Sequence, residues 1–164
     1  MLKLNQTVMY GTTGVCTVIN IEEKKIGREK REYYVLKPNS AATSTVFVPA
    51  DNELLLAKAR ELISGAQIAK MFEELPKAES VWIDIDSERK KVFGDTVMSG
   101  DRFACLSLLK TLIVKQKQLS AVGKRLHLAD ERVLREVQRL ICDEFSFVLG
   151  STPDEVFAEI QGLI

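Results

Sequence analysis

Val8-Met9-Tyr10-Gly11-Thr12-Thr13-Gly14-Val15 opens the part of the chain that decides its fold. Residues of high β propensity alternate here and continue to Ile21, and the two glycines between them permit a tight turn. Two more β-patterned runs follow, Arg31 to Lys37 and Ser44 to Val48, and a polar hairpin tip around Gly27 precedes them. The N-terminal part of the chain therefore predicts about four or five short antiparallel strands.

The remainder of the chain has the periodicity of helices, because its apolar residues recur at three- and four-residue steps. Capping boxes that begin at Ser64 and Thr152 mark the starts of two helices. We expect about five helices, placed at 64–75, from Asp84 or Asp86 to Met98, at 103–119, from Asp130 to about Val148, and from Thr152 onward. The predicted fold class is α+β, with a small Tudor- or SH3-like β-barrel at residues 1–53 and an all-helical bundle at 54–164.

Several sequence words in this order resemble the CarD (CdnL) family of bacterial transcription regulators. They are the stretch quoted above, Tyr33-Tyr34-Val35-Leu36-Lys37-Pro38, Val46-Phe47-Val48-Pro49-Ala50-Asp51, Ser99-Gly100-Asp101 and Gly123-Lys124-Arg125-Leu126. The family shares its N-terminal module with the transcription-repair coupling factor. The resemblance implies a cytoplasmic, non-catalytic regulator that associates with the nucleoid through RNA polymerase.

The resemblance also implies that the N-terminal module binds the β subunit of RNA polymerase. In the family, a sheet edge and two side chains, often both arginine, make the contact, and Lys24 and Phe47 occupy those two positions here. An edge strand can itself add a partner strand through main-chain hydrogen bonds. The full set of predicted contact residues is Lys24, Lys37, Thr45, Val46, Phe47 and Val48. The alternative for Phe47 is a place in the core of the barrel.

A second predicted interface contacts promoter DNA. Trp82 is the only tryptophan and precedes three cationic residues, so it could be an apolar wedge against unstacked bases while the cations bind phosphates. CarD proteins use a tryptophan in this way at the upstream edge of the promoter bubble, although their tryptophan position falls on Asp86 in this chain. The alternative for Trp82 is a place in the core. The predicted DNA-binding residues are Trp82, Arg89, Lys90, Lys91, Lys124 and Arg125, and Lys115 and Lys117 are further phosphate candidates.

The charge distribution favours this interface only in the middle of the chain. The whole molecule is neutral, with 23 Lys and Arg against 23 Asp and Glu. Residues 86–140 contain twelve basic and seven acidic residues, a net charge of +5, whereas residues 141–164 contain five acidic and no basic residues. A protein-interaction adaptor without DNA contact therefore remains the alternative function.

Catalysis is not expected from this sequence. His127 is the single histidine, and no nucleophile motif, phosphate loop or metal-ligand spacing accompanies it. Cys16, Cys105 and Cys142 each lie in an apolar run, which predicts buried thiols in a reducing compartment. The chain shows no signal peptide and no run of apolar residues long enough to span a membrane. We expect no cofactor, no metal, no membrane contact and a monomer.

Overall fold

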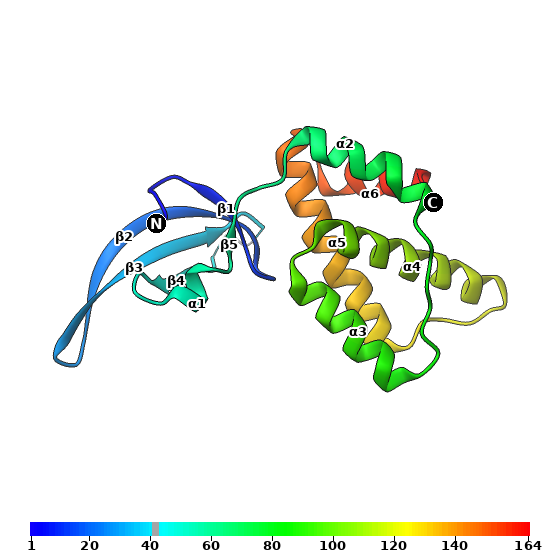
Figure 1. The fold of residues 1–164 in the computed structure, drawn as a ribbon, viewed down its shortest axis with the longest axis horizontal. Coiled ribbons are helices and arrows are strands. Elements are labelled where there is room, and N and C mark those ends of the chain that lie inside the picture. Colours follow the sequence, from blue (N-terminus) through cyan, green and yellow to red (C-terminus); the bar gives the residue numbers. More distant parts are fainter. Residues whose placement is uncertain (41–42) are drawn as a thin grey trace. The chain divides into compact units, whose positions relative to one another are not determined.

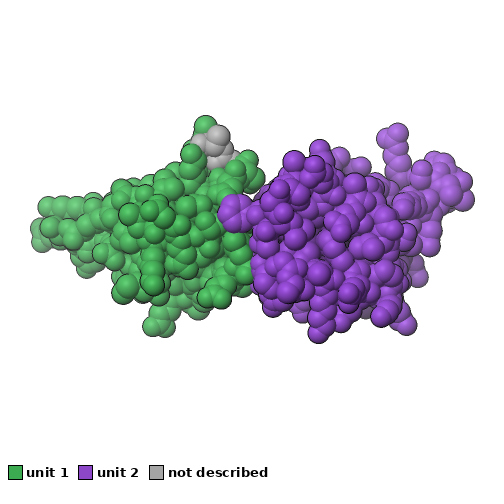
Figure 2. Space-filling model, turned by 90° about the horizontal axis from the view of Figure 1, so that it is seen from above, with its two compact units in different colours: residues 1–62 green, residues 63–164 purple. Residues whose placement is uncertain are grey.

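The computed structural model describes residues 1–40 and 43–164 and divides into two compact units, residues 1–62 and 63–164 (Figure 2). The boundary lies nine residues later than the sequence predicted, after Leu62 instead of after residue 53. The reason is a short strand, β5 (Ala59–Arg60), which pairs with the first strand, β1 (Thr7–Tyr10), and so belongs to the sheet. Periodicity cannot reveal a strand of two residues.

The first unit is a five-stranded antiparallel sheet in the order β4-β3-β2-β1-β5 (Figure 1). Its remaining strands are β2 (Gly14–Ile26), β3 (Glu29–Pro38) and β4 (Val46–Pro49). The predicted turn at Gly11 and Gly14 is confirmed, and both glycines have positive φ. The sheet is not closed, however, so the predicted barrel is better described as an open, Tudor-like sheet with β4 and β5 at its edges.

The β2–β3 hairpin is longer than the sequence predicted. Residues 22–32 were expected to form a polar tip, yet they continue the ladder to Ile26 and Glu29, with Lys24 opposite Arg31. The turn contains Gly27, whose φ is 65°. A bulge between Val18 and Asn20 shifts the register and moves the following side chains to the opposite faces.

The core of the first unit lies on one face of this sheet. It contains seven buried residues, namely Val8, Tyr10, Cys16, Val18, Tyr34, Leu36 and Val48. Leu55 and Leu56 pack against them from α1 (Glu53–Leu56), a one-turn helix that Asn52 caps through a hydrogen bond from the Leu55 amide. This helix closes one end of the face.

The second unit contains five α-helices and one 3-10 turn among the described residues, which confirms the predicted number of helices. They are α2 (Gly65–Glu74), η1 (Leu75–Lys77), α3 (Asp86–Ser99), α4 (Arg102–Ala121), α5 (Leu128–Leu149) and α6 (Pro153–Gly162). Both predicted capping boxes are present, at Ser64 with Gln67 and at Thr152 with Glu155. Helix α5 begins two residues before Asp130, whose carboxylate pairs with another helix instead of capping its own.

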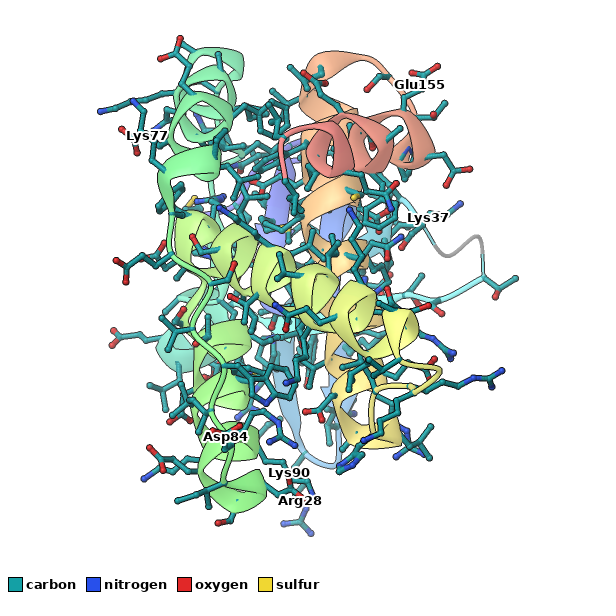
Figure 3. The ribbon with its side chains drawn as sticks, turned by 90° about the vertical axis from the view of Figure 1, so that its right-hand side faces the viewer. Arg28, Lys37, Lys77, Asp84, Lys90 and Glu155 are labelled. Atoms are coloured by element: carbon teal, nitrogen blue, oxygen red, sulfur yellow. The ribbon has the colours of Figure 1, made fainter. Side chains whose placement is uncertain are left out.

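Two buried polar residues connect the helices of this unit. Glu144 of α5 is 1% exposed and accepts hydrogen bonds from the Arg102 guanidinium and from the backbone amide of Ile63. Lys110 of α4 donates to the carbonyl oxygens of Leu75, Pro76 and Ala78, which fixes the chain after α2. Figure 3 shows Lys77 and Glu155 at one end of the helical unit and Asp84 and Lys90 at the other. No helix in the part of the chain that the structure describes is long and apolar enough to cross a membrane.

Candidate functional site

The first candidate site is the outer edge of β4. The Ala50 amide donates to the Glu32 carbonyl at 2.9 Å, and Ala50 follows the ladder that pairs Tyr34 with Val48. In an antiparallel ladder, residues alternate between facing the partner strand and facing away from it. The amide and carbonyl of Phe47 therefore face away from β3, as does the nitrogen of Pro49, which has no hydrogen to donate. The open edge thus offers one donor and one acceptor at Phe47.

The side chains of the two predicted contact residues meet on one face of the sheet. The Lys24 ammonium lies 3.5 Å from the centre of the Phe47 ring, and the Tyr33 ring meets Phe47 edge-on, with 6.5 Å between centroids. Phe47 is 41% exposed, so the alternative of a core position for Phe47 is wrong. Tyr33 was not predicted as part of this site, because it cannot be known from sequence that the bulge brings β2 and β4 side chains together over β3.

The other predicted contact residues of this site differ in how far their side chains are exposed. Lys37 and Thr45 are exposed, and Val46 is half-buried. Val48 is fully buried in the core, so its side chain cannot contact a partner and the prediction for that side chain is corrected. Alternation explains the difference, because Val46 and Val48 face the core while Phe47 faces outward.

Trp82 lies at the rim of the helical core and not on an open surface. Its ring meets Phe93 edge-on at 5.9 Å between centroids, and it packs against the core of the second unit. Two cations lie beside the ring, the Arg89 guanidinium carbon at 4.6 Å and the Lys115 ammonium at 5.0 Å from its centre. The indole is therefore held in place by an aromatic neighbour and by charges, and it is only partly exposed.

Arg89 does not present the free cation that the sequence predicted. It is 3% exposed, and it donates two hydrogen bonds to the Asp130 carboxylate, at 2.9 and 3.0 Å, and one to Asp86 at 2.6 Å. The hydrogen bond to Asp130 is the main cause of a raised pKa for Arg89, and the hydrogen bond from Arg89 lowers the pKa of Asp86. We therefore correct the assignment of Arg89 to phosphate contact, since its charge is neutralised inside the unit.

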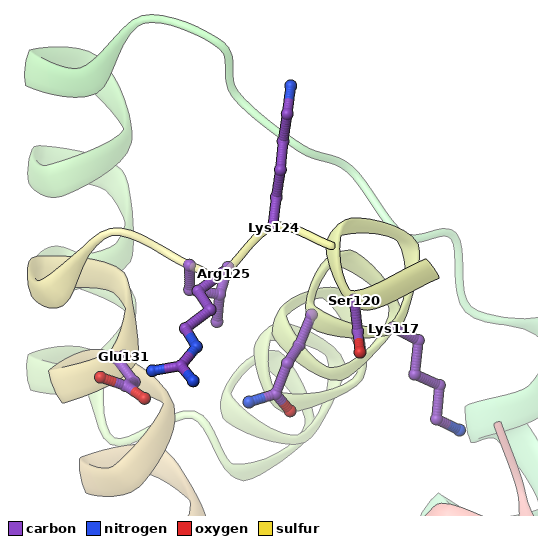
Figure 4. A pocket seen from close by; sticks show the side chains of 7 residues that line it. Lys117, Ser120, Lys124, Arg125 and Glu131 are labelled. Carbon is purple, nitrogen blue, oxygen red and sulfur yellow. The ribbon is translucent and has the colours of Figure 1, made fainter. Parts of the chain in front are cut away.

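The remaining predicted cations lie on α3 and on the loop between α4 and α5. Lys90, Lys91, Lys124 and Arg125 are exposed. Two hollows adjoin the loop, one of about 370 Å³ that includes Lys117, Lys124 and Arg125, and one of about 290 Å³ that includes Trp82, Lys115 and His127. In Figure 4, the Lys124 side chain extends away from the loop, whereas the Arg125 side chain extends toward Glu131 of α5. Trp82, Lys115 and Lys124 line one of these hollows, and Lys90 and Lys91 are exposed on α3. We call these five residues together the cationic end of the helical unit.

The groups that could support catalysis are dispersed or buried. The three cysteines are buried thiols, as predicted. Burial raises the pKa of the Cys16 thiol to about 11 and that of Cys142 to about 12, which keeps both thiols protonated at neutral pH. His127 lies 3.9 Å from Asp86 at the surface. Within the described residues, no group of His, Cys, Asp and Glu side chains could hold a metal ion.

Comparisons with known proteins give one match to the sheet unit and one that spans most of the chain. Residues 2–59, which contain the β4 edge, match the model of the CarD-like/TRCF RID domain. The whole chain is similar to a Bacillus subtilis (strain 168) protein named "Putative transcription factor YdeB", with 20% identity over 156 residues that cover 95% of this chain and 97% of the relative. The sheet unit matches the domain over nearly its full length, and the similarity to the relative continues through the helices. The N-terminal sheet unit therefore matches the CarD-like/TRCF RID domain, and the chain over most of its length is similar to one putative transcription factor.

Proposed function

We propose that the protein is a non-catalytic transcription regulator that binds the β subunit of RNA polymerase and contacts promoter DNA at the upstream edge of the bubble. The observation that carries the proposal is the open β4 edge, where the outward amide and carbonyl of Phe47 lie next to the exposed Lys24–Phe47 pair. This edge belongs to the domain type that CarD proteins share with the transcription-repair coupling factor. Main-chain hydrogen bonds to such an edge supply affinity, and the exposed side chains supply specificity.

The DNA contact is assigned to the cationic end of the helical unit. Lys90, Lys91 and Lys124 are exposed and suit phosphate contacts, which hold a protein on DNA without reading its sequence. Trp82 would touch a base only with the exposed part of its ring, since Phe93 and Arg89 hold the remainder. With so few free cations the contact is weak by itself. Tethering by polymerase makes it effective, because a linked site acts at an effective concentration that reaches about the millimolar range.

The regulator changes open-complex stability only through a difference in affinity between the closed and open promoter. A wedge beside phosphate contacts gives such a difference, because the edge of melted DNA exists only in the open state. We further propose that the protein acts as a monomer in the cytoplasm and reaches the nucleoid through polymerase.

The second candidate function is a protein-interaction adaptor without DNA contact. It is favoured by the loss of one predicted cation, since Arg89 is neutralised by Asp130. Asp84 and Asp86 also border the hollow beside Trp82 and would repel phosphates. DNA binding that does not respond to salt, or no DNA binding at all, would favour the adaptor.

A pull-down with the intact chain tests the proposal. The parent protein should retain the polymerase β subunit, and the double variant Lys24→Glu with Phe47→Asp should lose about 1 to 3 kcal/mol of binding free energy. Both side chains are exposed, so the variant should fold, which far-UV circular dichroism would verify. Unchanged retention of polymerase by the folded double variant would exclude this interface.

A further inference from the structure

Helix α3 begins with a residue that is poorly suited to that position. Ile85 occupies its N-cap, and the Ile85 side chain makes no capping hydrogen bond. Isoleucine is among the least favourable N-cap residues, since it has no side-chain oxygen to accept from the free amides of the first turn. Most other helices of the chain have such a bond, because four of the six α-helices in the described residues are capped by Asn52, Ser64, Asp101 and Thr152. The isoleucine therefore leaves a stabilising interaction unused.

Burial does not compensate for this choice of residue. Ile85 is 61% exposed, whereas Trp82 and Ile83 just before it pack against the helical core. A single exposed apolar residue is ordinary on a protein surface. At an N-cap, however, an isoleucine that gains little from burial has no evident structural role. A residue that breaks a local rule without a compensating contact is typical of a functional site.

The backbone that presents Ile85 is held in place by a buried arginine. The Arg89 guanidinium donates to the carbonyl oxygens of Ile83 and Asp84, at 2.8 and 3.4 Å. The Arg89 backbone amide donates to the Ile85 carbonyl at 2.8 Å, and the Asp130 carboxylate fixes the guanidinium. Isoleucine is β-branched, so its side chain has few χ1 rotamers. Ile85 is therefore a stiff apolar projection on a fixed backbone.

The charges around Ile85 favour a base over a phosphate as its contact. Asp84 and Asp86 flank it in sequence and border the hollow of about 290 Å³, so they would repel a phosphate placed directly at Ile85. Cations lie further out, because Lys124 borders the same hollow and Lys90 is exposed in the second turn of α3. This arrangement suits DNA whose phosphates bind the outer lysines while a base meets the apolar side chain.

We propose that Ile85 is the apolar side chain that inserts against the last stacked base pair at the upstream edge of the promoter bubble. This inference rests on the proposed function and assigns the wedge to a residue that the sequence did not single out. Leucine and isoleucine serve as wedges in other proteins that unstack DNA. Trp82 supports the segment through its contacts with Phe93 and Arg89. Because a wedge contacts only melted DNA, Ile85 should affect the lifetime of the open complex and not polymerase binding.

The test measures the lifetime of open promoter complexes formed by RNA polymerase with the intact chain. Ile85→Ala should lose roughly half or more of the lengthening that the parent confers, because most of the apolar contact area is removed. Ile85→Leu keeps that area and should retain the lengthening. Met98→Ala is the matched control, since Met98 is 71% exposed near the other end of α3, and it should behave like the parent. A full lifetime with folded Ile85→Ala, while the parent lengthens it, overturns the wedge and leaves the proposed function intact.

A further substitution separates the wedge from a loss of stability. Ile85→Asn supplies a favourable N-cap without adding charge, so it should raise the denaturant midpoint of unfolding and still shorten the open-complex lifetime. A more stable Ile85→Asn with a full lifetime would overturn the inference. All variants should bind the polymerase β subunit like the parent, and weaker binding by Ile85→Ala would assign Ile85 to a protein contact instead. If the parent itself does not lengthen the lifetime, the proposed DNA contact fails together with the wedge.

Discussion

The Asp130 carboxylate at the start of α5 accepts two hydrogen bonds from the Arg89 guanidinium of α3, and both side chains are 4% exposed. The same guanidinium donates to the carbonyl of Ile83 at 2.8 Å and lies 4.6 Å from the Trp82 ring. A single buried arginine therefore fixes α3, α5 and the segment that contains Trp82. The geometry of the cationic end depends on this pair.

Asp130→Asn should destabilise the protein by about 3 to 5 kcal/mol, because it leaves the buried charge of Arg89 without its main partner. Denaturant unfolding followed by circular dichroism measures the loss. Asp86→Asn is the control, since Asp86 also bonds Arg89 but its side chain is 57% exposed, and it should cost much less. Equal losses for the two variants would show that burial of the Arg89–Asp130 pair has no special role.

Asp143→Asn should raise stability at neutral pH. Oδ2 of Asp143 is buried without a hydrogen-bond partner among the described residues, and burial raises the pKa of this carboxyl above its ordinary value of 3.8. Arg139 lies 4.0 Å away and offsets only part of the cost. A raised folded-state pKa means that the stability linked to this group is greatest below the ordinary pKa and is lost as pH rises through the folded pKa.

Thermal unfolding at about pH 7 and about pH 4 measures this effect, because the difference in unfolding temperature between Asp143→Asn and the parent should depend on pH. The variant should unfold at a higher temperature at neutral pH, and the gap should shrink as the pH falls, because the raised pKa favours protonation of the parent carboxyl in the folded state. A variant that is less stable than the parent at neutral pH would show that the charge on Asp143 stabilises the fold.

DNA binding by the intact chain should be weak and dependent on salt. If two or three lysines contact phosphates, log K should fall against log salt with a slope of about −2 to −3. Lys124→Ala should reduce the magnitude of that slope by about one. Lys77→Ala is the matched control, because Lys77 lies at the opposite end of the helical unit (Figure 3). The same slope for parent and Lys124→Ala would exclude Lys124 from the DNA contact.

Substitution of Trp82 distinguishes a structural role in packing against Phe93 from a direct contact with melted DNA. Trp82→Ala should leave polymerase binding unchanged and shorten the lifetime of the open promoter complex, but it also removes the contact with Phe93 and should cost about 1 to 3 kcal/mol of stability. Trp82→Phe keeps a ring against Phe93 and reduces the surface available to DNA. If Trp82→Phe is as stable as the parent and gives a shortened open-complex lifetime, the indole contacts DNA. A full lifetime with stable Trp82→Phe would leave Trp82 a packing role only.

The sequence predicted the elements that depend on local signals. The turn at Gly11 and Gly14, the capping boxes at Ser64 and Thr152, and the division into sheet and helices all follow from residue type and spacing, and all are confirmed. It could not predict β5, the ladder up to Ile26 or the open form of the sheet, because these depend on pairing between distant segments.

The predicted site residues likewise divide into those that follow from local sequence and those that depend on contacts between distant segments. Alternation along β4 places Phe47 on the face opposite Val46 and Val48, and it could have identified Val48 as a core residue. The burial of Arg89 was not predictable, because its partner Asp130 is 41 residues away and was expected only to start a helix. The role of Lys115 beside Trp82 likewise depends on how α4 crosses the segment before α3.

Amide hydrogen exchange at β4, with and without the polymerase β subunit, tests the central claim most directly. In the free protein the Phe47 amide faces the open edge and should exchange quickly, whereas the amides of Val46 and Val48 face β3 and should be protected. Strand addition predicts that polymerase strongly slows exchange at Phe47 and leaves its two neighbours nearly unchanged. Fast exchange at Phe47 in the saturated complex would contradict the account.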